Sequence, residues 1–159
     1  ITKIKPFQVK IIDFEFTTKN RYSSRSIGTM SYMSPQLLQN LYYDTQKNDI
    51  WTLGVIFFSI YTNNRPYKEP EKRNLDCNWL IAIKEKRWDE YWDAIENSCD
   101  ENINKILLDE NGNLPQQFKD IIELMLCWEQ KDRGNLNTII KHPFLSKTKS
   151  STCCKCIFS

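Results

Sequence analysis

The sequence predicts a mainly helical fold, from two kinds of observation. The first is a long apolar run, in which only Thr52 and Ser59 are polar between Ile50 and Tyr61. A helix that is apolar on every side is typical of the buried centre of a helical domain. The second is a pair of segments in which apolar residues recur at intervals of three and four positions, the spacing of amphipathic helices. These residues are Trp88, Tyr91, Trp92 and Ile95 in one segment, and Phe118, Ile121, Ile122 and Met125 in the other.

Composition limits the class of protein. The 159 residues are enough for about one domain, and 40% of them are hydrophobic, which suffices for a core. The net charge of +2 is too small to indicate a nucleic-acid partner. Three of the six cysteines fall within the last seven residues, and the others show no paired spacing. This pattern favours a reducing, cytoplasmic location over a disulfide framework or a zinc site, and His142 has no second histidine beside it to bind metal.

The segments before the apolar run predict little regular structure. Val9 to Phe14 is rich in β-branched residues and predicts a short strand. Residues 15–29 are polar and aperiodic, so we expect a loop. Pro35 then opens a short helix expected over residues 36–40, because proline is favoured at the first helical position.

The apolar run itself predicts a helix from Asn48 to Tyr61. Asn48 and Asp49 are candidate cap residues, and Asn63-Asn64 followed by Pro66 should end the helix. Four further helices are expected: over residues 76–84, through the Trp88 segment, from Pro115 onward, and over residues 137–142. After Phe144 the composition changes to Lys, Ser, Thr and Cys, which predicts a flexible tail.

Five short motifs occur in order along the chain: IIDFE (11–15), GTMSYMSPQ (28–36), NDIWTLGV (48–55), Arg133 and HPF (142–144). The series resembles the C-terminal lobe of a eukaryotic protein kinase of the serine/threonine type, whose marks run D-F-G, G-T-x-x-Y-x-A-P-E, D-x-W-x-x-G and a late arginine before H-P-F. The resemblance implies a kinase-like lobe over residues 1–146 and a separate tail over 147–159.

The resemblance implies roles for particular residues. Asp13 would hold Mg²⁺ and, through it, the phosphates of ATP. The alternative is a solvated aspartate at the end of a strand. Thr29 would lie beside the catalytic aspartate and the substrate, which points to serine/threonine specificity. Ser23, Ser24 and Ser26 would lie in the activation loop as candidates for phosphorylation, although solvated loop serines are an equal alternative.

Two positions depart from the family pattern. Glu15 replaces the glycine of D-F-G, which restricts the backbone and adds a negative charge. Gln36 replaces the glutamate that, in the family, pairs with the late arginine, here Arg133. A glutamine can still accept a hydrogen bond from the guanidinium, but it brings no charge. Asp49 resembles the buried aspartate that accepts backbone N–H bonds from the catalytic loop, and a helix cap is its alternative role.

The glycine-rich loop, the ATP-binding lysine and the H-R-D catalytic loop of the family are not in this sequence. The chain therefore reads as part of a longer serine/threonine kinase that transfers the γ-phosphoryl group of ATP to protein hydroxyls. The 159 residues by themselves should be inactive. An alternative is a pseudokinase that serves as a binding scaffold, which Glu15 and Gln36 both permit.

The tail carries a further motif. Cys156-Ile157-Phe158-Ser159 fits the C-a-a-X pattern of prenylation, and its final serine favours farnesyl. Cys153 and Cys154 are candidates for palmitoylation, and a second lipid would make a marginal anchor stable. The tail thus suggests membrane association, and a membrane-tethered interaction domain is a third interpretation of the chain.

Overall fold

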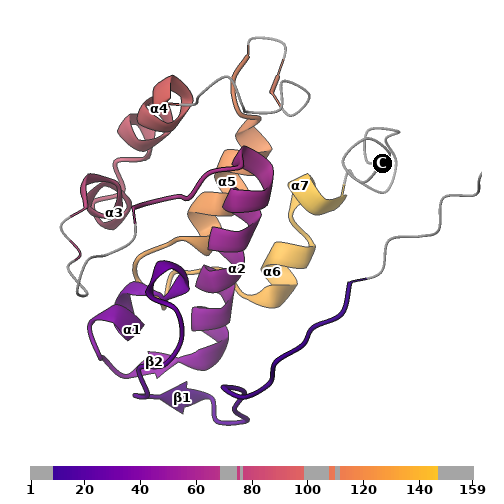
Figure 1. The fold of residues 1–159 in the computed structure, drawn as a ribbon. Coiled ribbons are helices and arrows are strands. Elements are labelled where there is room, and N and C mark those ends of the chain that lie inside the picture. Colours follow the sequence, from indigo (N-terminus) through magenta and orange to yellow (C-terminus); the bar gives the residue numbers. More distant parts are fainter. Residues whose placement is uncertain (1–8, 69–74, 76, 99–107, 110–111, 147–159) are drawn as a thin grey trace, which may run out of the picture.

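The computed structural model describes residues 9–68, 75, 77–98, 108–109 and 112–146. The described part is mainly helical, as predicted, and it carries one two-stranded sheet (Figure 1). The elements in chain order are β1 (Tyr22–Ser23), the 3₁₀ turn η1 (Met30–Tyr32), α1 (Pro35–Leu38), β2 (Tyr43–Asp44), α2 (Thr45–Thr62), α3 (Asn78–Lys84), α4 (Trp88–Ser98), α5 (Gln116–Met125), α6 (Leu136–Ile140) and α7 (Pro143–Ser146). The tail 147–159 lies outside the described residues.

Helix α2 is the central element, and it packs most closely on α5. A Cβ atom added to Gly54 would lie 2.9 Å from Cβ of Met125 and from Cδ2 of Leu126. The two backbones can approach this closely only because Gly54 has no side chain. Around this contact the largest core cluster includes the fully buried Trp51 and Phe58 of α2 and Phe118 of α5.

The start of α2 differs from the prediction. The helix begins at Thr45, and its N-cap is Asp44, whose Oδ1 accepts from the backbone N–H groups of Gln46 (3.0 Å) and Lys47 (3.1 Å). The prediction that Asn48 or Asp49 caps the helix was wrong, because a cap signal one turn upstream satisfies the free N–H groups first. The predicted end is confirmed: the C-cap is Asn63, in the left-handed conformation (φ +53°).

The expectation that α2 is buried on every side was also wrong. Ile60 is 70% exposed and Ile56 38% exposed, whereas Val55 and Phe58 are buried. The apolar pattern could not reveal this, because it records the chemistry of a face and not the presence of a neighbour to cover it. Within the described residues, this face of the helix is open.

Val9 to Phe14 does not form the predicted strand, because a strand needs a hydrogen-bonded partner and the described residues supply none. The apolar side chains here are exposed, Ile11 by 81%. The sheet forms elsewhere: β1 pairs antiparallel with β2, with Tyr22 opposite Asp44. β1 thus lies inside the segment 15–29, which the sequence predicted to be a loop. The sequence could not reveal this strand, because two residues are too few to show an alternating apolar pattern.

The remaining helices follow the amphipathic patterns. Tyr91, Trp92 and Ile95 on α4 are buried in the core, so this stripe serves packing and not ligand binding. Pro115 is the N-cap of α5 and not its first residue. The predicted helix over residues 137–142 corresponds to α6, and the sequence did not predict α7, which follows His142. Nδ1 of His142 accepts from the backbone N–H of Phe144 at 3.3 Å. Among the described helices, none has both the length and the apolar character needed to span a membrane.

Candidate functional site

The structure brings Gln36 and Arg133 together at the base of the lobe. Arg133 is 2% exposed, and its Nη2 donates to Oε1 of Gln36 at 3.0 Å. The other guanidinium hydrogen bonds go to backbone carbonyls: Nε to Cys127 (2.9 Å), Nη1 to Lys47 (2.9 Å) and Nη2 to Trp128 (3.1 Å). The guanidinium carbon also lies 4.9 Å from the centre of the Trp51 ring, a cation–π contact. The cluster joins α1, α2 and the segment after α5.

None of these acceptors is a carboxylate. Burial lowers the pKa of Arg133 to about 10, and the charges of more distant groups such as Glu129 and Asp44 offset this only in part. Both ends of the Gln36 amide are hydrogen-bonded, because its Nε2 also donates to the carbonyl of Trp128 at 2.8 Å. The guanidinium therefore has hydrogen-bond acceptors, but within the part of the chain that the structure describes its buried positive charge has no adjacent counter-charge.

Ser34, two residues before Gln36, is fully buried, and within the described residues its hydroxyl has no hydrogen-bond partner. A buried unsatisfied hydroxyl costs about 1–3 kcal/mol. We therefore expect Ser34→Ala to raise the free energy of unfolding by about 1 kcal/mol in urea denaturation. Ser59→Ala is the control, because the Ser59 hydroxyl donates to the Val55 carbonyl at 2.8 Å and its removal should bring no gain. Equal responses of the two variants would contradict the unsatisfied state of Ser34.

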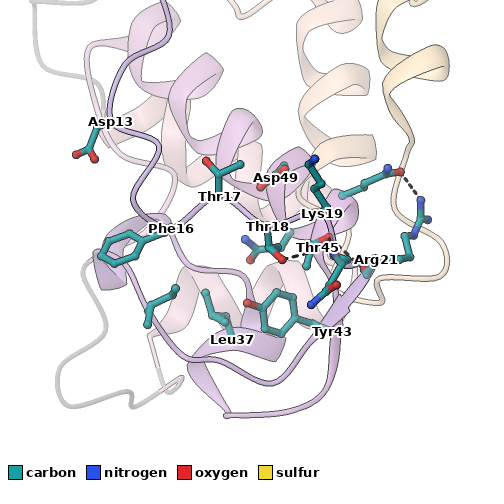
Figure 2. A pocket seen from close by; sticks show the side chains of 14 residues that line it. Asp13, Phe16, Thr17, Thr18, Lys19, Arg21, Leu37, Tyr43, Thr45 and Asp49 are labelled. Atoms are coloured by element: carbon teal, nitrogen blue, oxygen red, sulfur yellow. Dashed lines mark hydrogen bonds between the residues drawn. The ribbon is translucent and has the colours of Figure 1, made fainter.

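A cavity of about 530 Å³ lies between the loop after Asp13 and the first two turns of α2. Figure 2 shows Asp49 grouped with Thr18, Lys19 and Arg21, whereas Asp13 lies apart at one end with its carboxylate pointing away from that group. The volume of this cavity is within the range of ligand-binding pockets.

Two acceptors in the wall of this cavity lack donors among the described residues. Oδ1 of Asn48 is buried and makes no hydrogen bond. Among the described residues, the Asp49 carboxylate likewise has no hydrogen-bond or ion-pair partner. Partial burial of its carboxyl raises the pKa of Asp49, and the nearby charge of Asp44 raises it further. A carboxyl group with a raised pKa in the wall of a cavity is a candidate functional residue.

We expect Asp49→Asn to stabilise the isolated chain at pH 7. Because the pKa of Asp49 is raised in the fold, its ionised form is the disfavoured one, and asparagine removes that charge. As the pH falls toward the raised pKa, the wild-type carboxyl takes up a proton and its penalty disappears, so the two proteins should converge. Thermal unfolding of both proteins between pH 4 and 8 measures this. A variant that is less stable than the wild type at pH 7 would show that Asp49 is a stabilising group.

Asp13 adopts a left-handed backbone conformation (φ +64°) and is solvent-exposed. This conformation is uncommon outside glycine, although aspartate tolerates it best, and such strain often marks functional positions. Among the described residues no group of three metal-ligating side chains exists. The donor chemistry of Asp13 nevertheless fits Mg²⁺, which uses one or two protein carboxylates and takes its other ligands from phosphates and water.

The predicted substrate-side and activation-loop residues lie on the segment between Asp13 and α1. Thr29 is exposed and immediately precedes η1 without a side-chain cap bond, so its hydroxyl is available. The three serines differ. Ser26 is partly buried and donates to the carbonyl of Leu37 (3.1 Å), and Ser23 accepts from a backbone N–H at 3.1 Å, whereas Ser24 is exposed. Ser24 is therefore the most accessible of the three to modification.

Sequence reasoning missed Asp44. Besides capping α2, its Oδ2 accepts from Nε of Arg21 at 2.8 Å, and its strand pairs with β1. Arg21, which precedes the three candidate serines in the sequence, is thus already paired with Asp44. The signal was present as an aspartate directly before a helix-forming segment, but the prediction placed the helix start at Asn48, next to the apolar run that begins at Ile50. The lipidation candidates Cys153, Cys154 and Cys156 lie outside the described residues, and their modification stays a prediction.

Comparison with known proteins identifies the family of the chain. The family model described as protein kinase domain matches residues 2–145. The chain is 29% identical over 140 residues to the Saccharomyces cerevisiae protein YPL150W, named as a serine/threonine-protein kinase, covering 86% of this chain and 13% of that protein. It is 25% identical over 151 residues to the dual specificity mitogen-activated protein kinase kinase dSOR1 of Drosophila melanogaster (89% and 37%).

A third relative is the human SNF-related serine/threonine-protein kinase, 25% identical over 155 residues, with 92% of this chain and 16% of that protein covered. The chain thus spans well under two-thirds of the length of each of these relatives. The family match covers most of the chain, and it agrees with the helical fold and with the meeting of Gln36 and Arg133. The chain therefore belongs to the protein kinase domain family.

Proposed function

We propose that the protein carrying this chain is a serine/threonine protein kinase that transfers the γ-phosphoryl group of ATP to hydroxyl groups of protein substrates. Within it, the described residues would form the helical lobe that supports the substrate and one metal ligand. The observation that carries the proposal is the cavity beside α2, where Asp49 and Oδ1 of Asn48 face space without donors from the described residues.

Oδ1 of Asn48 requires an N–H or O–H donor, because a buried acceptor without one is costly, and the exposed Asp49 carboxylate beside it can accept further hydrogen bonds. A loop whose backbone N–H groups reach Asp49 would satisfy them and fill the cavity. In the proposed function this is the catalytic loop, which would bring the base close to Thr29. The 159 residues contain no H-R-D sequence, so that loop would come from another part of the protein.

Asp13 would hold Mg²⁺, which neutralises charge on the ATP phosphates as the phosphoryl group moves. Its exposure and its fixed left-handed backbone leave the carboxylate accessible to a metal–nucleotide complex. Thr29 would orient the acceptor hydroxyl, because its own hydroxyl is not used to cap η1. Phosphate on Ser24 would order the loop only by competing with Asp44 for Arg21, or by using Arg25.

A pseudokinase scaffold is the second candidate. The specific observation in its favour is Glu15, which places a second negative charge two residues from Asp13 and removes the conformational freedom of glycine. A scaffold would bind partner proteins through the same surfaces without phosphoryl transfer.

Labelled γ-phosphate transfer distinguishes the two. The longer protein, with MgATP and a mixture of protein substrates, should label serine and threonine residues, as determined by phosphoamino-acid analysis. The isolated 159-residue chain should label none, because it lacks a catalytic base. Absence of transfer by the longer protein would favour the scaffold, and label on tyrosine alone would contradict the proposed specificity.

A further inference from the structure

A further groove, of about 530 Å³, lies between η1, the C-terminal end of α2 and α3. Its walls are Tyr32 of η1, the Asn63-Asn64 turn and Trp79 of α3, and two cationic residues, Arg65 and Lys68, line it as well. None of the lining residues that the structure describes is a carboxylate. Groups that donate hydrogen bonds therefore dominate the groove, since ammonium, guanidinium and amide side chains are its main polar components.

The groove is built on fixed elements. The carbonyl of Tyr32 accepts from Oγ1 of Thr52 at 3.0 Å, which ties η1 to α2. Tyr67, at the floor, is 2% exposed, and its hydroxyl accepts from Nε1 of Trp51 at 3.0 Å. The Trp79 ring is held edge-on against Tyr91, with centroids 6.2 Å apart. The walls are thus positioned before any ligand arrives, which lowers the entropic cost of binding.

The groove is also close to the proposed position of the acceptor hydroxyl. Thr29 and Tyr32 belong to one turn, because the N–H of Tyr32 donates to the carbonyl of Thr29 at 3.0 Å. A peptide whose hydroxyl lies at Thr29 would therefore continue over Tyr32 and into the groove.

We propose that this groove selects protein substrates that carry an anionic side chain, a carboxylate or a phosphorylated residue, near the acceptor hydroxyl. Lys68 is the main determinant of this selectivity, because its side chain is exposed at the groove. Among the described residues its ammonium has no ion-pair partner that an incoming anion would have to displace. Arg65 and the amides of the asparagine turn add donors. The proposal rests on the proposed function for its biological meaning, but the binding itself needs neither ATP nor catalysis.

The test uses the isotope-labelled 159-residue chain and three peptides of twelve residues that differ only around a central serine: one with flanking glutamates, one with flanking phosphoserines and one with flanking lysines. Fluorescence anisotropy at low salt gives the affinity, and amide chemical shifts locate the site. We expect the two anionic peptides to bind at least about tenfold more tightly than the basic one, and to shift the amides of Tyr32, Asn64 and Lys68. The tighter of the two identifies the preferred anion.

Lys68→Glu should lower the affinity for the anionic peptides by about tenfold and raise the affinity for the basic peptide, because it reverses the charge at the groove. Lys131→Glu makes the same change in net charge at an exposed position outside the groove and should alter the affinities by less than about twofold. The proposal is overturned if no peptide binds, if the basic peptide binds as well as the anionic ones, or if the two variants behave alike. Failure of the phosphoryl-transfer assay with intact peptide selectivity would instead refute only the enzymatic function.

Discussion

Replacing Gln36 by glutamate should raise the free energy of unfolding by about 1–2 kcal/mol. The Gln36 amide accepts from Nη2 of Arg133 at 3.0 Å, so a carboxylate in the same position would accept the same bond and add the missing counter-charge. Hydrogen bonds to charged groups contribute about 1.5–3 kcal/mol, more than neutral ones. The gain is limited because the donor from Nε2 to the Trp128 carbonyl is lost. Urea denaturation of the chain at pH 7 measures the change.

Arg133→Met removes the charge and keeps most of the stem that packs on Trp51. Breaking a buried ion pair by removing one partner costs about 3–5 kcal/mol, but here no ion pair exists, so we expect a smaller loss. It will not vanish, because the carbonyls of Cys127 and Lys47 lose their donors.

The double variant separates these effects. With methionine at position 133, Gln36→Glu should lose its benefit and leave a buried carboxylate without a partner. The coupling energy between the two positions should therefore be well above about 0.5 kcal/mol, the limit expected for independent sites. Additive effects would show that the bond between the two side chains does not contribute to stability, and the closure of the lobe would lose its main local support.

The sequence predicted the helical fold because its strongest patterns are set by packing. Trp92 and Phe118 recur at helical spacing with other apolar residues, and both are buried in the core. The same logic failed for α2, where Ile60 is apolar yet 70% exposed. Spacing identifies a face that is suited to burial, but only the tertiary structure shows whether another element covers that face.

Short and non-local features were the hardest to predict. The two strands are two residues each, and their pairing depends on the position of Asp44 relative to Tyr22, which are far apart in the sequence. The contact between Gln36 and Arg133 spans 97 positions and was expected only through the family resemblance. Hydrogen-bond deficits such as that of Asn48 depend on neighbouring atoms, and no sequence pattern encodes them.

Asp13→Asn in the longer protein should lower the rate of phosphoryl transfer by about a hundredfold or more. Asparagine keeps the shape and the tolerance for the left-handed backbone at this position, but it removes the negative charge that Mg²⁺ requires. Preorganised electrostatic groups at a transferring phosphoryl typically contribute two to three orders of magnitude to the rate. Asp93→Asn, the same chemical change at an exposed position on α4, should leave the rate within about twofold of the wild type.

The rate of γ-phosphate transfer as a function of Mg²⁺ concentration, for the wild type, Asp13→Asn and Asp93→Asn, is the most direct test of the proposed kinase function. We expect the wild type and Asp93→Asn to show the same saturating dependence on Mg²⁺, and Asp13→Asn to show a much lower rate that needs far more metal. An Asp13→Asn protein with unchanged turnover and unchanged Mg²⁺ dependence would contradict the assignment of Asp13 as the metal ligand.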